Sequence, residues 1–119
     1  MDDVNSLPLI FECNEIYVND KDYWDEIIQL TFVKNENENI SFTRLSYEED
    51  IYIEHNDQIN FIYAFYKNVN FNLGERKLSV NVIPGKKMNM PNAIEIVFSQ
   101  TIDNLEEILR CLKAPTICI

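Results

Sequence analysis

Alternation of apolar and polar residues constrains the fold of this chain more than any other feature of its sequence. In several short runs the apolar side chains share one face of a period of two: Trp24, Ile28, Leu30 and Phe32; Ile40 and Phe42; Ile51 and Ile53; Ile59, Phe61, Tyr63 and Phe65; Leu78, Val80 and Val82. Successive side chains of a β-strand point to opposite faces, so each run predicts a strand. Residues 93–99 predict the last one.

Polar segments between these runs predict the turns. "NENEN" at 35–39 suits a hairpin, and "HNDQ" at 55–58 suits the turn after the run at Ile51 and Ile53. Pro84-Gly85 suits the central positions of a type II turn, with "GKK" at 85–87 as a solvated hairpin tip. The segment 20–30 fits either a short helix or a strand, because periodicity does not separate the two there.

The apolar spacing becomes helical near the end of the chain. In "TIDNLEEILRCLKA" the apolar positions are Ile102, Leu105, Ile108, Leu109 and Leu112. Thr101 or Asp103 can cap the start of such a helix, Arg110 and Lys113 suit its last turn, and Pro115 ends it. We therefore predict an α+β fold, a mostly antiparallel meander with a C-terminal amphipathic helix packed on it. The pattern also fits a strongly curved sheet.

Length and composition predict one folded domain spanning residues 1–119, because 46% of the residues are hydrophobic. The apolar run 7–11 is too short to span a bilayer, has no basic flank and precedes no small-residue cleavage site, so no export signal is expected. Cys13, Cys111 and Cys118 form no CxxC pair and are odd in number. They predict buried, reduced cysteines and a cytoplasmic location.

Negative charge is concentrated in the first half of the chain. Residues 1–57 hold fifteen acidic residues against three basic ones, a net charge of −12, whereas residues 58–119 hold five against seven, a net charge of +2. Solubility alone needs no such asymmetry, and self-repulsion on this scale opposes folding. A basic partner is the simplest explanation.

Enzymatic chemistry finds little support in the sequence. A hydrolase would need His55 as its base, oriented by Glu54 or Asp57, but no nucleophile motif accompanies it. A glycosidase pair could be drawn from Glu48, Glu49, Asp50 and Glu54, although acidic residues are so frequent that such pairs arise by chance. We expect no catalytic residues and no enzyme activity.

Metal, cofactor and nucleic-acid sites are not expected either. Zinc would require the three cysteines and a fourth ligand, His55 or a carboxylate, at spacings that match no usual site. The acidic segment 19–26 lacks the glycine of a calcium loop, and Thr31 stands where the loop's last glutamate would be. Two glycines cannot supply a phosphate-binding loop, and a pI near 4.4 opposes direct binding to a polyanion.

What remains is a protein-binding surface. Aromatic residues stand among the acidic ones, and aromatic side chains are enriched in interface cores while carboxylates pair with Arg and Lys of a partner. Tyr52 and Glu54 would share the outer face of a strand whose Ile51 and Ile53 face the core. The predicted partner-binding residues are Asp20, Asp22, Tyr23, Asp25, Tyr47, Glu48, Glu49, Asp50, Tyr52, Glu54 and Asp57.

In size, in the acidity of "DKDYWDE" and "SYEEDIYIEHND", and in its lack of a catalytic motif, the chain resembles the small acidic immunity proteins that bacteria pair with secreted or contact-delivered toxins. That resemblance implies a cytoplasmic inhibitor of a basic toxin domain, above all a nuclease, with no membrane association. Two alternatives stay open: a carrier of a small apolar ligand inside a curved sheet, and a phage-type mimic of DNA.

Overall fold

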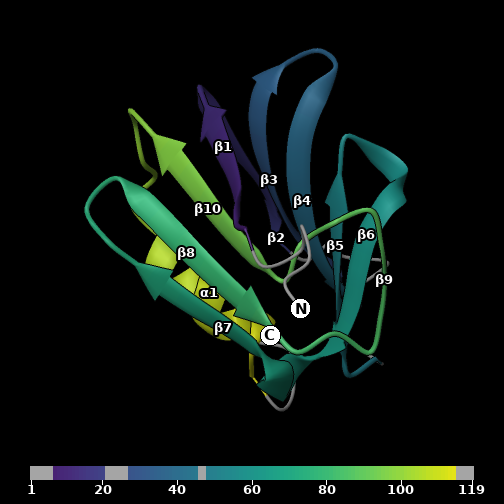
Figure 1. The fold of residues 1–119 in the computed structure, drawn as a ribbon. Helices are drawn as coiled ribbons and strands as arrows, with labels where there is room; N and C mark the ends of the chain where they lie inside the picture. Colours follow the sequence, from purple (N-terminus) through teal and green to yellow (C-terminus); the bar gives the residue numbers. More distant parts are fainter. Residues whose placement is uncertain (1–6, 21–26, 46–47, 115–119) are drawn as a thin grey trace.

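Two β-sheets make up most of the chain (Figure 1). The computed structural model describes residues 7–20, 27–45 and 48–114, and within these ranges one sheet has six strands and the other has four. The six-stranded sheet runs in the order β2 (Glu15–Asp20), β3 (Ile27–Asn35), β4 (Glu38–Leu45), β5 (Asp50–His55), β6 (Asp57–Phe65) and β9 (Lys86–Met88). The four-stranded sheet runs in the order β1 (Leu9–Cys13), β10 (Ala93–Phe98), β8 (Lys77–Val82) and β7 (Val69–Leu73).

Strands β2 to β6 form the antiparallel meander that the alternation predicts. Asn35 and Glu38 close the β3–β4 hairpin within the predicted "NENEN" segment. The turn between β5 and β6 consists of Asn56, whose φ of 67° lies in a region that asparagine tolerates better than most residues. Its side-chain oxygen accepts a 3.0 Å hydrogen bond from the Asn39 backbone, which fixes the turn against β4.

The four-stranded sheet is mixed, because β1 runs parallel to β10 while the other pairs are antiparallel. In the parallel pair Leu9 stands opposite Ile94 and Phe11 opposite Ile96. β1 therefore pairs with a strand that lies about 80 residues later in the sequence. Pairing between strands this far apart in sequence leaves no local sequence signal.

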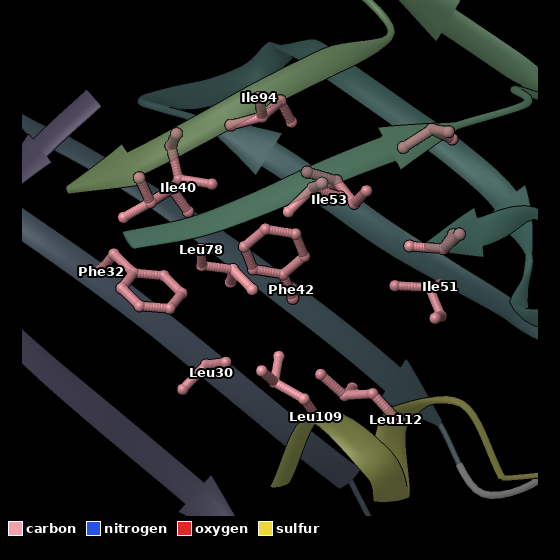
Figure 2. Close-up of a cluster of buried hydrophobic side chains, with 14 of the residues drawn as sticks. Leu30, Phe32, Ile40, Phe42, Ile51, Ile53, Leu78, Ile94, Leu109 and Leu112 are labelled. Atoms are coloured by element: carbon pink, nitrogen blue, oxygen red, sulfur yellow. The ribbon is translucent and has the colours of Figure 1, made fainter. Parts of the chain in front are cut away.

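The core lies between the two sheets and includes the predicted apolar faces of β3, β4, β5 and β8. The predicted face of β6 is not part of it, because Ile62 and Ala64 face the core in place of Phe61 and Tyr63. Figure 2 shows Leu78 and Ile94 of the four-stranded sheet in one cluster with side chains of β3, β4 and β5. The cluster is fully buried at Leu30, Phe32, Ile40, Phe42, Ile51 and Ile53. Phe32 stacks on Phe98 with ring centroids 6.3 Å apart, and Phe42 meets Phe71 edge on at 5.7 Å. These ring contacts hold the sheets face to face.

The C-terminal helix α1 (Leu105–Leu112) confirms the predicted amphipathic segment. Leu109 and Leu112 point into the core cluster (Figure 2). The predicted N-cap is wrong, because Asn104 precedes the helix and no side chain caps it; the hydroxyl of Thr101 instead bonds the carbonyl oxygen of Ile102. A short 3-10 helix, η2 (Tyr66–Asn68), connects β6 to β7. Neither α1 nor η2, the helices of the described residues, is long and apolar enough to cross a membrane.

Pro84-Gly85 does not form the predicted type II turn. Gly85 does not adopt the positive φ that this turn requires at its second central residue. The segment instead carries the chain from β8 in one sheet to β9 in the other, and Gly85 donates a 2.9 Å hydrogen bond to the carbonyl oxygen of Tyr63. Lys86 and Lys87 are therefore strand residues that pair with β6, not a hairpin tip.

The cysteines follow the prediction only in part. Cys13 is buried and free, and burial raises the pKa of its thiol to about 11. Cys111 is also buried but is disulfide-bonded, so the expectation of three reduced cysteines is wrong there. Its partner lies outside the described residues. Stable disulfides are typical of oxidising compartments, so the cytoplasmic location stays a prediction.

Candidate functional site

The face of the six-stranded sheet that points away from the core carries a row of large polar and aromatic side chains. Gln29, Thr43, Tyr52 and Tyr63 stand opposite one another on β3, β4, β5 and β6. Each belongs to the strand face opposite the buried positions, and each is half-buried by its neighbours. We call these four residues, together with Glu54 and Phe61, the outer face.

The outer face is hollowed at its centre. A depression of about 440 Å³ is lined by Gln29, Thr43, Tyr52, Glu54 and Tyr63. Glu54 stands on β5 two residues after Tyr52, on the same side of the strand, because side chains alternate along it. Five side chains from four strands thus converge on one concavity.

Three rings form a continuous aromatic cluster on the outer face. Tyr63 stacks on Phe61 with centroids 4.5 Å apart, and it meets Tyr52 at 4.7 Å with the two ring planes at 85°. Perpendicular and offset arrangements are the favourable ones for aromatic pairs. The rings therefore hold one another in fixed orientations, with Tyr52 and Tyr63 partly exposed and Phe61 buried.

A hydrogen bond from its hydroxyl to a carboxylate oxygen of Glu48 fixes the position of Tyr52. This bond, with a smaller contribution from burial, raises the pKa of Tyr52 to about 12. Glu48 in turn is held through its backbone, since its carbonyl oxygen accepts a 3.0 Å hydrogen bond from Arg44 Nε. The buried Arg44 thus anchors the segment that positions Tyr52.

The carboxylates around Tyr52 are not neutralised by described cations. Glu48, Asp50 and Glu54 flank the tyrosine on the outer side of β5 or just before it. Among the described residues the ion pairs are Lys77–Glu95 and Glu107–Arg110, both elsewhere. Burial lowers the pKa of the Arg44 guanidinium, and the charge of the exposed Glu49 opposes this shift in part. In the part of the chain that the structure describes, Asp50 and Glu54 therefore have no ion-pair partner, and the Glu48 carboxylate is hydrogen-bonded to Tyr52.

Not every acidic residue of the first half belongs to this surface. Glu12 lies on β1 in the other sheet, and Glu36 is exposed in the β3–β4 turn. Lys86 of β9 stands opposite Tyr63 and brings a positive charge to the border of the outer face. The acidic surface centred on β5 is thus a local feature and not the whole of the negative half.

Several predicted interface residues cannot be placed. Asp22, Tyr23, Asp25 and Tyr47 lie outside the described residues. Asp20 and Asp57 belong to β2 and β6, but only their backbone is described. The structure describes the side chains of the other five predicted residues, Glu48, Glu49, Asp50, Tyr52 and Glu54.

The structure adds residues that the sequence did not assign to the site. Gln29, Thr43, Phe61 and Tyr63 belong to the outer face, while Ile62 and Ala64 of β6 face the core. Both faces of β6 are apolar or aromatic, so alternation alone does not show which face is buried.

Catalytic and metal chemistry gain no geometric support among the residues that can be placed. His55 stands on the opposite side of β5 from Glu54, and its ring meets Phe11 edge on with centroids 5.8 Å apart. Within the described ranges no three His, Cys, Asp or Glu side chains come together as a metal site would require. The outer face can instead bind: it offers rings, carboxylates and hydrogen-bond acceptors.

No protein-family model matches the chain, and neither the curated proteins nor the solved structures include a significant match to it. What the outer face binds must therefore follow from its own side chains.

Proposed function

We propose that this chain is a stoichiometric protein inhibitor of the immunity-protein kind, which binds and neutralises a basic toxin domain through its outer face. The observation that carries the proposal is the fixed Tyr52, held by Glu48 and Tyr63 beside the carboxylates of Asp50 and Glu54. It acts as a binding protein and not as an enzyme.

The composition of the outer face is that of a binding hot spot. Tyrosine is among the residues that contribute most to protein interfaces, and a ring that is already held loses little conformational entropy on binding. Carboxylates at the border of the aromatic cluster steer a cationic partner and pair with its Arg and Lys side chains. Tyr52 and its neighbours combine both properties.

A nuclease domain fits this surface better than other toxins, because it must present cationic groups to bind phosphates. Carboxylates of the inhibitor can occupy the positions that the phosphates of RNA or DNA take on such a domain. The cytoplasm, where the nucleic acid lies, is the compartment in which this protection is needed.

The carrier alternative has no comparable observation in its favour. The described core residues Leu30, Phe32, Phe42 and Leu78 fill the space between the sheets, each with 0% of its surface exposed. The depression of the outer face lies on the other side of the six-stranded sheet.

Affinity capture with the full chain tests the proposal. The tagged protein is used to retain partners from the native host, bound proteins are identified by mass spectrometry, and the toxicity of the captured protein is assayed with and without the chain. We expect a basic protein whose toxicity is abolished at equimolar ratio. A captured protein that stays toxic with excess chain would contradict the proposal.

A further inference from the structure

The depression in the outer face offers several hydrogen-bond acceptors, beside the donor hydroxyl groups of Thr43 and Tyr63 and the second amide hydrogen of Gln29. Gln29 Nε2 donates a 3.1 Å hydrogen bond to Thr43 Oγ1, and this orients the amide so that its oxygen remains as an acceptor. The hydroxyl of Tyr52 is already used as the donor to Glu48. Glu54 adds two carboxylate oxygens that accept only.

Two of the five residues that line the depression are aromatic. Tyr52 and Tyr63 stand at 85° to each other and both line it. The faces of aromatic rings attract cations, and a planar guanidinium also stacks on them. A concavity lined by two aromatic rings and by hydrogen-bond acceptors complements a flat cation that carries several donors.

We infer that this depression binds the side chain of an arginine residue of the partner protein. Arginine presents five N–H donors and no acceptor in one plane, and it pairs with a carboxylate through two parallel hydrogen bonds. Glu54 takes the carboxylate role, Gln29 supplies a further acceptor, and the guanidinium packs against the tyrosine rings from the solvent side. This inference rests on the proposed function, which supplies the basic partner, and specifies the side chain that this partner inserts.

Titration with N-acetyl-arginine amide tests the inference without the partner. The backbone amides of the full chain and the side-chain amide of Gln29 are followed by NMR, and N-acetyl-lysine amide and the neutral N-acetyl-citrulline amide serve as comparison probes. We expect saturable shifts at Gln29, Thr43, Tyr52 and Glu54, strongest with the arginine probe, weaker with lysine and absent with citrulline.

Two matched variants distinguish binding in the depression from a general effect of the negative charge of the protein. Glu54→Gln removes the carboxylate of the depression and should weaken the arginine probe about tenfold, the loss expected for one charge-assisted pair. Glu75→Gln removes the same charge from the exposed β7–β8 turn and should leave the affinity unchanged. Equal weakening by the two variants would overturn the inference, as would equal binding of the citrulline probe.

The result can be told apart from that of the capture experiment. If the chain neutralises a basic toxin but the arginine probe does not shift the depression, the inference is wrong and the proposed function stands. If the probe binds there with the expected selectivity and the captured protein stays toxic, the arginine site is supported and the proposed function is wrong.

Discussion

Arg44 Nη1 donates a 2.8 Å hydrogen bond to the carbonyl oxygen of Leu112, the last residue of α1. The same nitrogen bonds the carbonyl oxygen of Ala114 at 2.6 Å, and the guanidinium lies 4.6 Å from the centre of the Tyr66 ring. Carbonyl groups at a helix end lack partners within the helix and carry partial negative charge. A buried arginine on β4 therefore ties the C-terminal helix to the six-stranded sheet.

Removing this anchor should destabilise the fold. Arg44→Met leaves the carbonyl groups of Leu112, Ala114 and Glu48 without their donor, and we expect a loss of about 3 kcal/mol in the free energy of unfolding measured by urea denaturation. Arg44→Lys keeps the charge but lacks the guanidinium fork, so its loss should be smaller and still measurable. Unchanged stability in Arg44→Met would show that the anchor has no energetic role.

The hydrogen bond between Tyr52 and Glu48 predicts a pH dependence of stability. The pKa of Tyr52 rises from the usual 10.0 to about 12 in the folded state, so the folded chain holds this proton more tightly than the unfolded chain does. The stabilisation is complete below pH 10.0 and is lost as the pH rises toward about 12. The free energy of unfolding should therefore fall more steeply in this range for the wild type than for Tyr52→Phe. Parallel profiles for the two proteins would refute the bond.

Adjacent residues of β5 should respond very differently to substitution. Ile53 is fully buried on the core face, whereas Glu54 lies on the outer face. Ile53→Ala should cost about 3 kcal/mol through lost burial and the cavity left behind, and Glu54→Gln should change stability by no more than about 0.5 kcal/mol. Thermal or urea unfolding distinguishes the two, and similar losses would mean that the faces of β5 are wrongly assigned.

Cys13 should be unreactive in the folded protein. Burial raises the pKa of its thiol to about 11, so the reactive thiolate is scarce near neutral pH. Alkylation followed by peptide mass spectrometry should find Cys13 unmodified in the native protein and modified after unfolding. Rapid native alkylation would place this thiol at the surface and contradict the packing of β1.

Local patterns predicted the parts of the fold that depend on neighbours in sequence. The β3–β4 hairpin, β5, β6 and α1 each repeat their apolar residues at the period of the element they form. β7 has the same signal, since Val69, Phe71 and Leu73 alternate with asparagines, although no strand is predicted there. The strands β8 and β10 are predicted, but their separation into a second sheet is not, because the parallel pairing of β1 with β10 has no local signature.

The candidate site was predictable to a similar extent. Tyr52 and Glu54 were assigned to the outer side of a strand because Ile51 and Ile53 alternate with them. Gln29 and Thr43 could not be found in this way, because they reach the depression through the register of neighbouring strands. No local sequence signal indicates the anchoring role of Arg44, because its partners Leu112 and Ala114 are distant in sequence.

The affinity of the captured partner for two charge-reversal variants shows whether the acidic side chains of the outer face form the binding surface. One variant replaces Glu48, Asp50 and Glu54 by lysine. The other replaces the exposed Glu12, Glu36 and Glu75 by lysine, so that both variants change the net charge equally. If the outer face binds a cationic surface, the first variant loses affinity by at least about a hundredfold, and the second keeps most of it. Wild-type affinity should also fall as salt is added. Equal losses of affinity in the two variants, or no loss in the first, would show that the outer face is not the binding surface.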